Sequence, residues 1–486
     1  MHFFSRLLAL SPSPAAARPS SRVPRHVSMT SRVVTFFAAV LLVLICVEGA
    51  SLPGSLYRTD NCTHDQALPL SKAVEDLLRP PSAVARWNAS LYRPQKIASA
   101  WVSQFSHITN DQVRALLDPL HRFQECILAQ IINGTLWFWG PLASLYDLNK
   151  RGFLPQRRYY ALLEIHEIVA LLPDMEMTLC TGDGPPQDAA SARNASFTSV
   201  AFYPNCPFPD FRVPCADGSM CAFIHGCIPF SGLDSAVPPH HWNATTEKLI
   251  STAQQSHALW SMKNSQAVFR GDERGCDVLV GEDGTIGAAT TGQFSEFCGR
   301  HLLHVLAREC RPELFNVSIF CHERIDLLEQ DLTFKYIVYA SGNSQWAGRL
   351  KLLLFTGSAT VKQLVTYGET FVLGLEPWVH YIPVDHRYHN LAEVVRWATE
   401  NDEAVFRIVQ NANTFAHAAL RADGMRALTL SLFKQYARKL AYVPTVPEAG
   451  AVRFSEYVRG TMFMQGEILG SGVELSSHEG RNSISC

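Results

Sequence analysis

Strands and helices alternate along the second half of the chain, and this alternation limits the possible fold most narrowly. Short apolar runs rich in β-branched and aromatic residues predict strands at 266–269, 317–320, 334–339, 359–362 and 380–384. Helical spacing of apolar residues predicts helices at 302–309, 347–355, 391–400, 403–420 and 426–440. Such alternation is typical of an α/β fold, in which helices cover a parallel sheet and ligands bind beyond the carboxyl ends of the strands.

The first half of the chain shows a less regular pattern. We predict helical structure over 65–133, with a capping box formed by Thr109 and Gln112, and a second helix over 159–172. Apolar runs predict strands at 175–180 and 200–203. Composition changes suggest four segments: a targeting segment at 1–50, an N-terminal α/β domain with a helical start and a cysteine-rich insert at 51–250, a C-terminal α/β domain at 251–440, and a loose tail at 441–486.

The beginning of the chain has the composition of a targeting segment. Residues 1–47 contain no acidic residue and end in the apolar run 33–47. This length suits the core of a signal peptide better than a membrane span of about 20 residues. A short signal anchor and an organelle transit peptide are the alternatives. If translation begins at Met29 rather than Met1, the run follows a short basic leader.

Sequons and cysteines indicate the lumen of the secretory pathway or the outside of the cell, and we expect the lumen of the endoplasmic reticulum or the Golgi. Six N-x-S/T sequons occur, at Asn61, Asn88, Asn133, Asn194, Asn243 and Asn316. The chain has 13 cysteines, many for a reducing compartment, with a cluster at Cys206, Cys215, Cys221 and Cys227. We expect disulfides, with a zinc site as the alternative for the cluster. The mature chain would be soluble or held by a short type II anchor.

The charge balance argues against nucleic acid as the main partner. The 42 Lys and Arg residues against 44 Asp and Glu residues give a net charge of -2, so no general positive field exists to attract a phosphate backbone. With 47% hydrophobic and 18% charged residues, the chain is also not intrinsically disordered.

Three charged residues stand where a parallel sheet would place a ligand. Asp183 and Arg270 follow predicted strands, and Arg349 lies at a predicted helix start. Taken alone, such loop residues are more often solvated or paired. The sequence contains no H-E-x-x-H, G-x-S-x-G, P-loop, G-x-G-x-x-G or D-x-D motif, which disfavours metal dependence.

A longer series of motifs contains these positions and resembles glycosyltransferase family 90. The motifs are Trp260-x-x-Lys263, Ala267-x-Phe269-Arg270-Gly271, Phe334-Lys335-Tyr336, Gly342, Arg349-Leu350-Lys351, Gly357-Ser358, Glu369 and the run PWVHYIPV at 377–384. Upstream, 172–177 followed by Asp183-x-Pro185 resembles the strand and loop that carry the family's catalytic aspartate. The resemblance covers about residues 100–440. The family includes Rumi-type protein O-glucosyltransferases, KDEL-containing relatives and fungal capsule xylosyltransferases.

The resemblance implies a GT-B architecture, in which two Rossmann-like domains face a cleft and the C-terminal domain holds a UDP-sugar. It implies an inverting displacement without metal or other cofactor, with Asp183 as the general base. Arg270 and Arg349 match arginines that contact the diphosphate. The other donor-site positions are Asn264, Gly271, Ser344, Gln345, Trp346, Ala347, Gly348 and Glu369, the last for the ribose hydroxyls. His380, within the most specific motif, is expected to be a packed residue.

Four departures from the family pattern leave alternatives open. Asp272 replaces a serine, Cys276-Asp277 replaces Arg-Asp, Gly182 replaces the arginine before the catalytic aspartate, and Ala347 replaces a serine in a loop one residue longer. The favoured hypothesis is a luminal transferase that moves a glucosyl or xylosyl residue to a hydroxyl of a protein or glycan. The alternatives are a non-catalytic family member that binds UDP-sugar, glycan or client protein, and a secreted disulfide-rich binding module.

Overall fold

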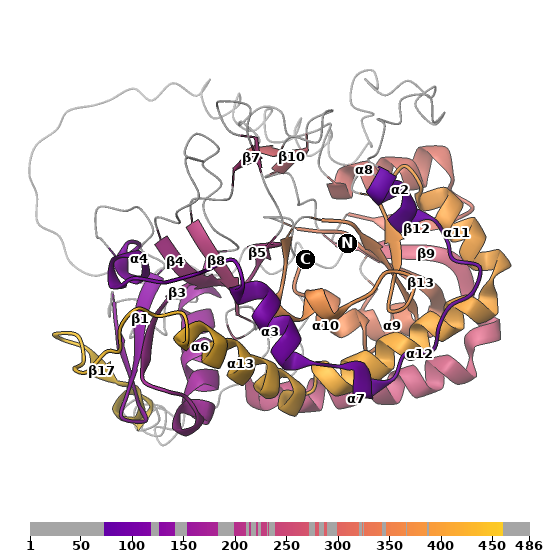
Figure 1. Ribbon diagram of the computed structural model, residues 1–486. Helices are drawn as coiled ribbons and strands as arrows, with labels where there is room; N and C mark the ends of the chain where they lie inside the picture. Colours follow the sequence, from indigo (N-terminus) through magenta and orange to yellow (C-terminus); the bar gives the residue numbers. More distant parts are fainter. Residues whose placement is uncertain are drawn as a thin grey trace, which may run out of the picture. The chain divides into compact units, whose positions relative to one another are not determined.

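The computed structural model shows mixed α/β structure built on two main sheets (Figure 1). It describes residues 72–117, 126–140, 153–182, 199–209, 213–214, 220–221, 225–230, 232, 239–271, 278–280, 286–288, 299–319, 323, 325–342, 347–365, 367–385 and 388–459. All of these belong to one compact unit, Cys62–Cys486. No helix within these ranges has the length and hydropathy needed to span a membrane, and the apolar run 33–47 lies outside them.

The predicted parallel sheet is confirmed. Its strands are β9 (Asn264–Arg270), β12 (Phe315–Ser318), β13 (Phe334–Tyr339), β14 (Ala359–Gln363) and β16 (Ile382–Val384). Their order is β12-β9-β13-β14-β16, and every neighbouring pair is parallel. Numbered along the chain, this is the 2-1-3-4-5 order of a doubly wound fold, whose strand order reverses between the first and third strands. The crevice between the carboxyl ends of β9 and β13 is therefore the expected ligand position.

Helices cover both faces of this sheet. On one face, α11 (Leu391–Glu400) and α12 (Asp402–Ala419) pack in one apolar cluster with Val338 and Val361. On the other face, α9 (Leu327–Thr333) and α10 (Leu350–Leu353) pack with Ile337 and Tyr339. The helix predicted at 347–355 is α-helical only over Leu350–Leu353, because both of its ends form tighter turns, in which the Leu350 N–H donates to the Ala347 carbonyl and the Phe355 N–H to the Leu352 carbonyl. The chain then turns at Gly357 into β14. A Cβ atom at Gly357 would lie 2.5 Å from the Ser256 hydroxyl, so the turn requires glycine.

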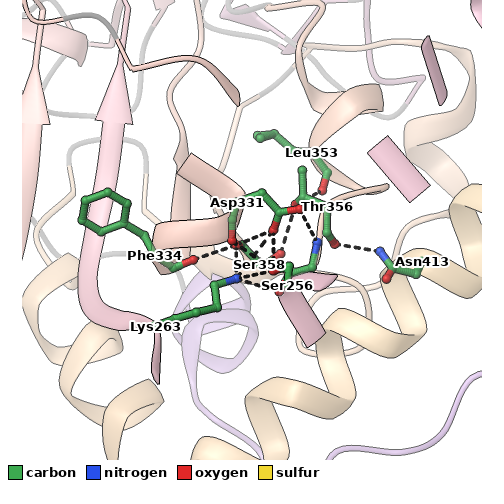
Figure 2. A network of polar contacts seen from close by, with 9 residues as sticks. Ser256, Lys263, Asp331, Phe334, Leu353, Thr356, Ser358 and Asn413 are labelled. Carbon is green, nitrogen blue, oxygen red and sulfur yellow. Dashed lines mark hydrogen bonds and ion pairs between the residues drawn. The ribbon is translucent and has the colours of Figure 1, made fainter. Parts of the chain in front are cut away.

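A buried ion pair joins α7 (Pro239–Ala258), α9 and the start of β14 (Figure 2). Lys263 Nζ lies 3.6 Å from Asp331 Oδ1, and both side chains are 0% exposed. The ammonium donates hydrogen bonds to the hydroxyls of Ser256 and Ser358, each at 2.7 Å, and to the Gly357 carbonyl at 3.0 Å. Asp331 accepts from both hydroxyls and from the Gly357 N–H. Burial lowers the pKa of Lys263 to about 8, against the opposing effect of Asp331.

We expect Asp331→Ala to lower the free energy of unfolding by about 3 kcal/mol, because it leaves a buried ammonium without its counter-charge. Urea denaturation followed by circular dichroism would measure the change. Glu403→Ala is the matched control, since Glu403 is an exposed acid in a surface pair with Arg407 and should change stability by less than about 0.5 kcal/mol. Equal effects of the two substitutions would contradict a structural role for the buried pair.

Five strands from the first half of the chain and one from its C-terminal part form a six-stranded mixed sheet in the order β17-β2-β1-β3-β4-β8. Its strands are β1 (Cys126–Ile132), β2 (Thr135–Trp139), β3 (Met175–Cys180), β4 (Ser199–Tyr203), β8 (His225–Pro229) and β17 (Val452–Arg453). The pairs β3-β4 and β4-β8 are parallel, and the other neighbouring pairs are antiparallel. The strands predicted at 175–180 and 200–203 are therefore confirmed.

The helical prediction for 65–133 is only partly correct. The helices there are α2 (Lys72–Leu78), α3 (Pro94–Val102) and α4 (Asn110–Arg114), and the capping box of Thr109 and Gln112 is present. Beyond them, β1 and β2 form a hairpin with positive φ at Asn133 and Gly134. This dipeptide favours the tight turn of a hairpin, which overrides the helical spacing of the preceding apolar residues. The predicted helix at 159–172 is present as α6 (Phe153–Ile168) followed by one 3₁₀ turn, Val169–Leu171.

Residues 441–459 of the expected loose tail pack against the first sheet. β17 pairs with β2, and the buried rings of Phe454 and Tyr457 pack edge-on against Phe138. Before them, α13 (Ala422–Ala437) packs on α3, and its Tyr436 hydroxyl donates to the Glu176 carbonyl. The chain thus returns to the first sheet because its aromatic side chains are buried there. Residues 460–486 lie outside the described part. Since α7 runs through residue 250, the division into domains near that position stays a prediction.

Disulfides are confirmed at four cysteines. One bond joins Cys126 of β1 to Cys180 of β3, and the other joins Cys206 to Cys227. The second pair belongs to the predicted cluster, so these two cysteines are disulfide partners rather than zinc ligands. Cys215 lies outside the described residues.

Candidate functional site

The switch point of the parallel sheet brings several predicted donor-site residues together. Arg270 ends β9 and Gly271 follows it, and Ala347 to Arg349 lie in the turn before α10. The Arg349 guanidinium donates to the Arg270 carbonyl at 2.7 Å, and the Ala347 N–H donates to the Tyr339 hydroxyl at 3.1 Å. Because Tyr339 ends β13, these bonds hold the 347–349 turn across the carboxyl ends of β9 and β13.

Two guanidinium groups lie close to the same aromatic ring at the switch point. The central carbon atoms of Arg300 and Arg349 each lie 5.5 Å from the ring centroid of Phe269. Arg300 also donates to the Ser341 carbonyl, directly after β13. Burial and the neighbouring Arg300 charge lower the pKa of Arg349 to about 10. Since like charges at close range disfavour each other, a bound anion would stabilise both arginines.

Gly271 allows this close packing. A Cβ atom at Gly271 would lie 2.9 Å from the Phe269 ring and 3.4 Å from an Arg300 nitrogen. The glycine of the Phe269-Arg270-Gly271 motif therefore leaves room for the shared ring and for Arg300.

Arg300 is a site residue that the sequence analysis missed. It lies in the first turn of α8 (Gly299–Val305), the helix that follows β9 in the doubly wound order. Counted by spacing from the Phe269-Arg270-Gly271 motif, the arginine of the family pattern falls on Cys276. In this chain a long segment separates β9 from α8, so an arginine at the start of α8 lies much further along the sequence. A search for the arginine at the start of the predicted 302–309 helix would have found it. Asp272 and Cys276-Asp277 lie outside the described residues.

The Arg270 side chain is directed away from this arrangement. Its guanidinium donates to the Asn316 carbonyl at 2.6 Å, the Asn316 side-chain oxygen at 2.5 Å, the Phe269 carbonyl at 2.9 Å and the Glu323 carbonyl at 2.8 Å. Burial lowers the pKa of Arg270. In this conformation the side chain braces the end of β12 and the following loop, and its backbone carbonyl is the atom that meets Arg349.

Asn264 is separated from the other described donor-site residues. It begins β9, whereas Arg270 ends it, so the two lie roughly 20 Å apart along an extended strand. Its exposed side chain bonds to Gln266. The donor contact of Asn264 stays a prediction, and its position does not favour it, because ligands of such a sheet bind at the opposite edge.

Glu369 forms a buried ion pair next to the first sheet. Its carboxylate lies 3.2 Å from Lys351 Nζ of α10, and its side chain is 2% exposed. The residues on either side of it contact the first sheet: β15 (Tyr367–Gly368) pairs with β5 (Cys206–Pro207), and the Thr370 hydroxyl donates to the carbonyl of Pro229 at the end of β8. Glu369, the residue predicted to bind the ribose, thus lies where the carboxyl end of β8 contacts the second half of the chain.

The strand that precedes Asp183 in the chain, β3, ends at this same edge of the first sheet. β3 ends at Cys180 and runs parallel to β4, which runs parallel to β8, so their carboxyl ends share one edge. The Thr181 carbonyl accepts a hydrogen bond from the Arg157 guanidinium at 2.7 Å, which fixes the first residue after the strand. Asp183 itself, together with Ser344, Gln345 and Trp346, lies outside the described residues.

A buried lysine near the switch point was not expected from the sequence. Lys362 of β14 pairs with Tyr339, and its ammonium lies 5.9 Å from the Tyr339 ring and 5.1 Å from the Tyr381 ring. Burial lowers the pKa of Lys362 to about 8. The Lys362 ammonium is attracted to both aromatic rings. It adds positive potential next to Tyr339, whose hydroxyl accepts the Ala347 N–H.

His380 is a packed residue, as expected. It is fully buried, its Nδ1 accepts the Glu376 N–H, and burial lowers its pKa to about 4. Within the described ranges, His, Cys, Asp and Glu form no group that could hold a metal ion.

The fold is thus a doubly wound α/β arrangement with two guanidinium groups, those of Arg300 and Arg349, at the switch point of its parallel sheet. Residues 156–462, more than half of the chain, match the model of glycosyl transferase family 90, and the chain therefore belongs to this family.

The similar proteins are protein O-glucosyltransferases. Protein O-glucosyltransferase 3 of Mus musculus is 27% identical over 272 residues, which cover 52% of this chain and 50% of the mouse protein. Protein O-glucosyltransferase 1 of Homo sapiens is 25% identical over 287 residues, covering 57% and 66%. Protein O-glucosyltransferase 2 of Danio rerio is 34% identical over 113 residues, covering 23% and 22%. The match to the mouse protein thus spans half of that protein's length.

Proposed function

We propose that the chain is an inverting glycosyltransferase that moves a glucosyl or xylosyl residue from a UDP-sugar to a hydroxyl of a protein or glycan. The observation that carries this proposal is the pair Arg300 and Arg349 on one ring at the switch point, in a member of a glycosyltransferase family. The names of the relatives support a glucosyl donor and a protein acceptor.

The two guanidinium groups would bind the diphosphate. Forked N–H donors suit phosphate oxygens, and they stabilise the negative charge that accumulates on departing UDP. Residues 344–348 would line the sugar and nucleotide pocket, with Glu369 on the ribose. Arg270 would hold the end of β12 in place, since its donors already bind carbonyl oxygens.

Asp183 would act as the general base. The acceptor hydroxyl gives its proton to the Asp183 carboxylate as its oxygen bonds to the anomeric carbon, and the bond from that carbon to the UDP oxygen breaks on the opposite face. The sugar is inverted and UDP leaves with the electron pair. An aspartate of ordinary pKa, about 3.9, is ionised at neutral pH and can accept this proton. No metal or other cofactor takes part in this proposal.

A GT-B architecture suits these roles. The carboxyl ends of β3, β4 and β8 share one edge, and the contacts of Gly368 and Thr370 join this edge to the half of the chain that carries the arginines. Asp183 and the diphosphate would then belong to opposite walls of one cleft.

A luminal compartment suits the cysteines. Disulfides persist in oxidising compartments, and the described residues contain two, Cys126–Cys180 and Cys206–Cys227. We propose the endoplasmic reticulum or Golgi, reached through the targeting segment 1–50, with 33–47 either removed or retained as an anchor.

One observation favours the non-catalytic alternative. Two predicted ligands, Arg270 and Glu369, bind groups of the protein itself. A member that uses these side chains for structure could bind UDP or a client protein without transferring a sugar.

Purified full-length chain incubated with a panel of UDP-sugars separates these functions. We expect slow UDP release from UDP-glucose or UDP-xylose, unchanged by EDTA, because cationic side chains replace a metal. UDP binding without release, even when candidate acceptor proteins are added, would support the binding protein. Absence of both binding and release would contradict the proposed donor site, and loss of release in EDTA would contradict metal independence.

A further inference from the structure

The four sequons within the described residues differ in how far their asparagines are open to solvent. Asn88, Asn133 and Asn243 are exposed, whereas Asn316 is half-buried in β12. The sequons at Asn61 and Asn194 lie outside the described part. Because an N-linked glycan is large and hydrophilic, only an asparagine whose side-chain nitrogen reaches solvent can carry one in the folded protein.

The three exposed asparagines lie in different local structures. Asn133 occupies the first position of the β1–β2 turn, with φ of 50°, and its backbone N–H donates to Asp174. Asn88 precedes a 3₁₀ turn, Ala89–Leu91, and its side-chain oxygen accepts the Ser90 N–H at 2.9 Å. Asn243 lies in α7 and is followed by an exposed alanine. In each case the amide nitrogen, where the glycan attaches, takes part in none of these bonds.

Asn316 is held by its neighbours. Its side-chain oxygen accepts from the Arg270 guanidinium at 2.5 Å, and its carbonyl accepts from the same group at 2.6 Å. The hydroxyl residue of its sequon, Ser318, is 1% exposed, and Val317 between them is buried in the apolar cluster of the sheet. A glycan on Asn316 would have to extend to solvent from a strand in which the next two side chains are buried. It would also have to pass the Arg270 side chain, which is hydrogen-bonded to Asn316.

We propose that Asn88, Asn133 and Asn243 carry N-linked oligosaccharides and that Asn316 is left bare, since its side chain supports Arg270 instead. The proposal rests on the luminal location within the proposed function, and not on the transfer reaction. It assigns the modification to three surface positions and excludes the sequon whose asparagine binds Arg270.

Glycosite mapping of the full chain tests the proposal. The chain would be expressed in human cells with a short C-terminal tag that contains its own sequon, and then treated with peptide N-glycosidase F in ¹⁸O-water. This enzyme converts each glycosylated asparagine into ¹⁸O-labelled aspartate, which peptide mass spectrometry locates. We expect labelled Asn88, Asn133 and Asn243 and unlabelled Asn316. In gels, Asn88→Gln, Asn133→Gln and Asn243→Gln should each increase mobility by one glycan, whereas the matched control Asn316→Gln should not.

The tag separates the two ways in which the proposal can fail. A glycosylated tag on a chain whose Asn88, Asn133 and Asn243 are bare would overturn the site assignment while the luminal location stands. Label at Asn316 in folded chain would overturn the assigned role of that asparagine. A tag without glycan would overturn the luminal location, and the site assignment with it.

Discussion

Replacing Asp183 by asparagine should lower the turnover of sugar transfer by roughly a hundredfold to ten-thousandfold, the contribution of a positioned general base. Asparagine has nearly the same shape but cannot take the acceptor's proton. Because Asp183 would face the acceptor rather than the diphosphate, UDP affinity should stay within about twofold, well under the tenfold change that 1.4 kcal/mol produces. Turnover is measured as UDP release in the presence of acceptor, and affinity by isothermal titration calorimetry.

Asp174→Asn is the matched control for this substitution. Asp174 immediately precedes the same strand, β3, at its opposite end, and its carboxylate accepts the Asn133 N–H, which an amide oxygen can also do. Turnover of this variant should equal that of the unchanged chain. If Asp183→Asn turns over normally, Asp183 has no part in the chemistry. If the substitution instead abolishes UDP binding, its role is in the donor site or in folding.

Replacing Arg349 by methionine should lower kcat/KM by on the order of a thousandfold, comparable to the loss of a preorganised donor at a developing anion. Methionine fills a similar volume but removes the charge and the fork, one nitrogen of which also holds the end of β9 through the Arg270 carbonyl. Arg300→Met should act in the same direction. Because both arginines would bind one diphosphate, their effects should combine non-additively in the double variant.

Two further variants test the Arg349 prediction. Arg349→Lys keeps a positive charge without the fork and should recover only part of the activity. Arg407→Met removes a partly exposed arginine of α12, which pairs with Glu403 on the surface, and should leave kcat/KM unchanged. Normal UDP binding and kcat/KM in Arg349→Met would exclude the switch point as the diphosphate site.

The parallel sheet could be predicted from the sequence because its strands are buried on both faces. Such strands appear as continuous apolar runs, and β13 was predicted with its observed bounds. The β1–β2 hairpin was missed because its apolar residues also fit helical spacing, so that only the Asn133-Gly134 turn distinguishes the two structures. The strand β17, which follows α13, was also missed. It forms by pairing with residues more than 300 positions earlier in the chain, as Val452 does with Phe138, and local sequence patterns do not encode such pairing.

Those residues of the candidate site that belong to a family motif directly after a strand or at a helix start could be predicted from the sequence. Arg349 and Gly271 were found in this way, and the structure places both at the switch point. Arg300 was missed because its distance from β9 along the chain hides its position at the start of the next helix. The bonds of Arg270 and Glu369 could not be predicted, because their partners Asn316 and Lys351 come from other elements.

A crystal structure of the chain with bound UDP-sugar is the measurement that tests the central claim most directly. The account predicts the diphosphate within hydrogen-bonding distance of both Arg300 and Arg349, at the carboxyl ends of β9 and β13. It also predicts the Asp183 carboxylate on the face of the anomeric carbon opposite the diphosphate. A nucleotide bound elsewhere, or an Asp183 side chain on the same face as UDP or turned away from the sugar, would contradict the account.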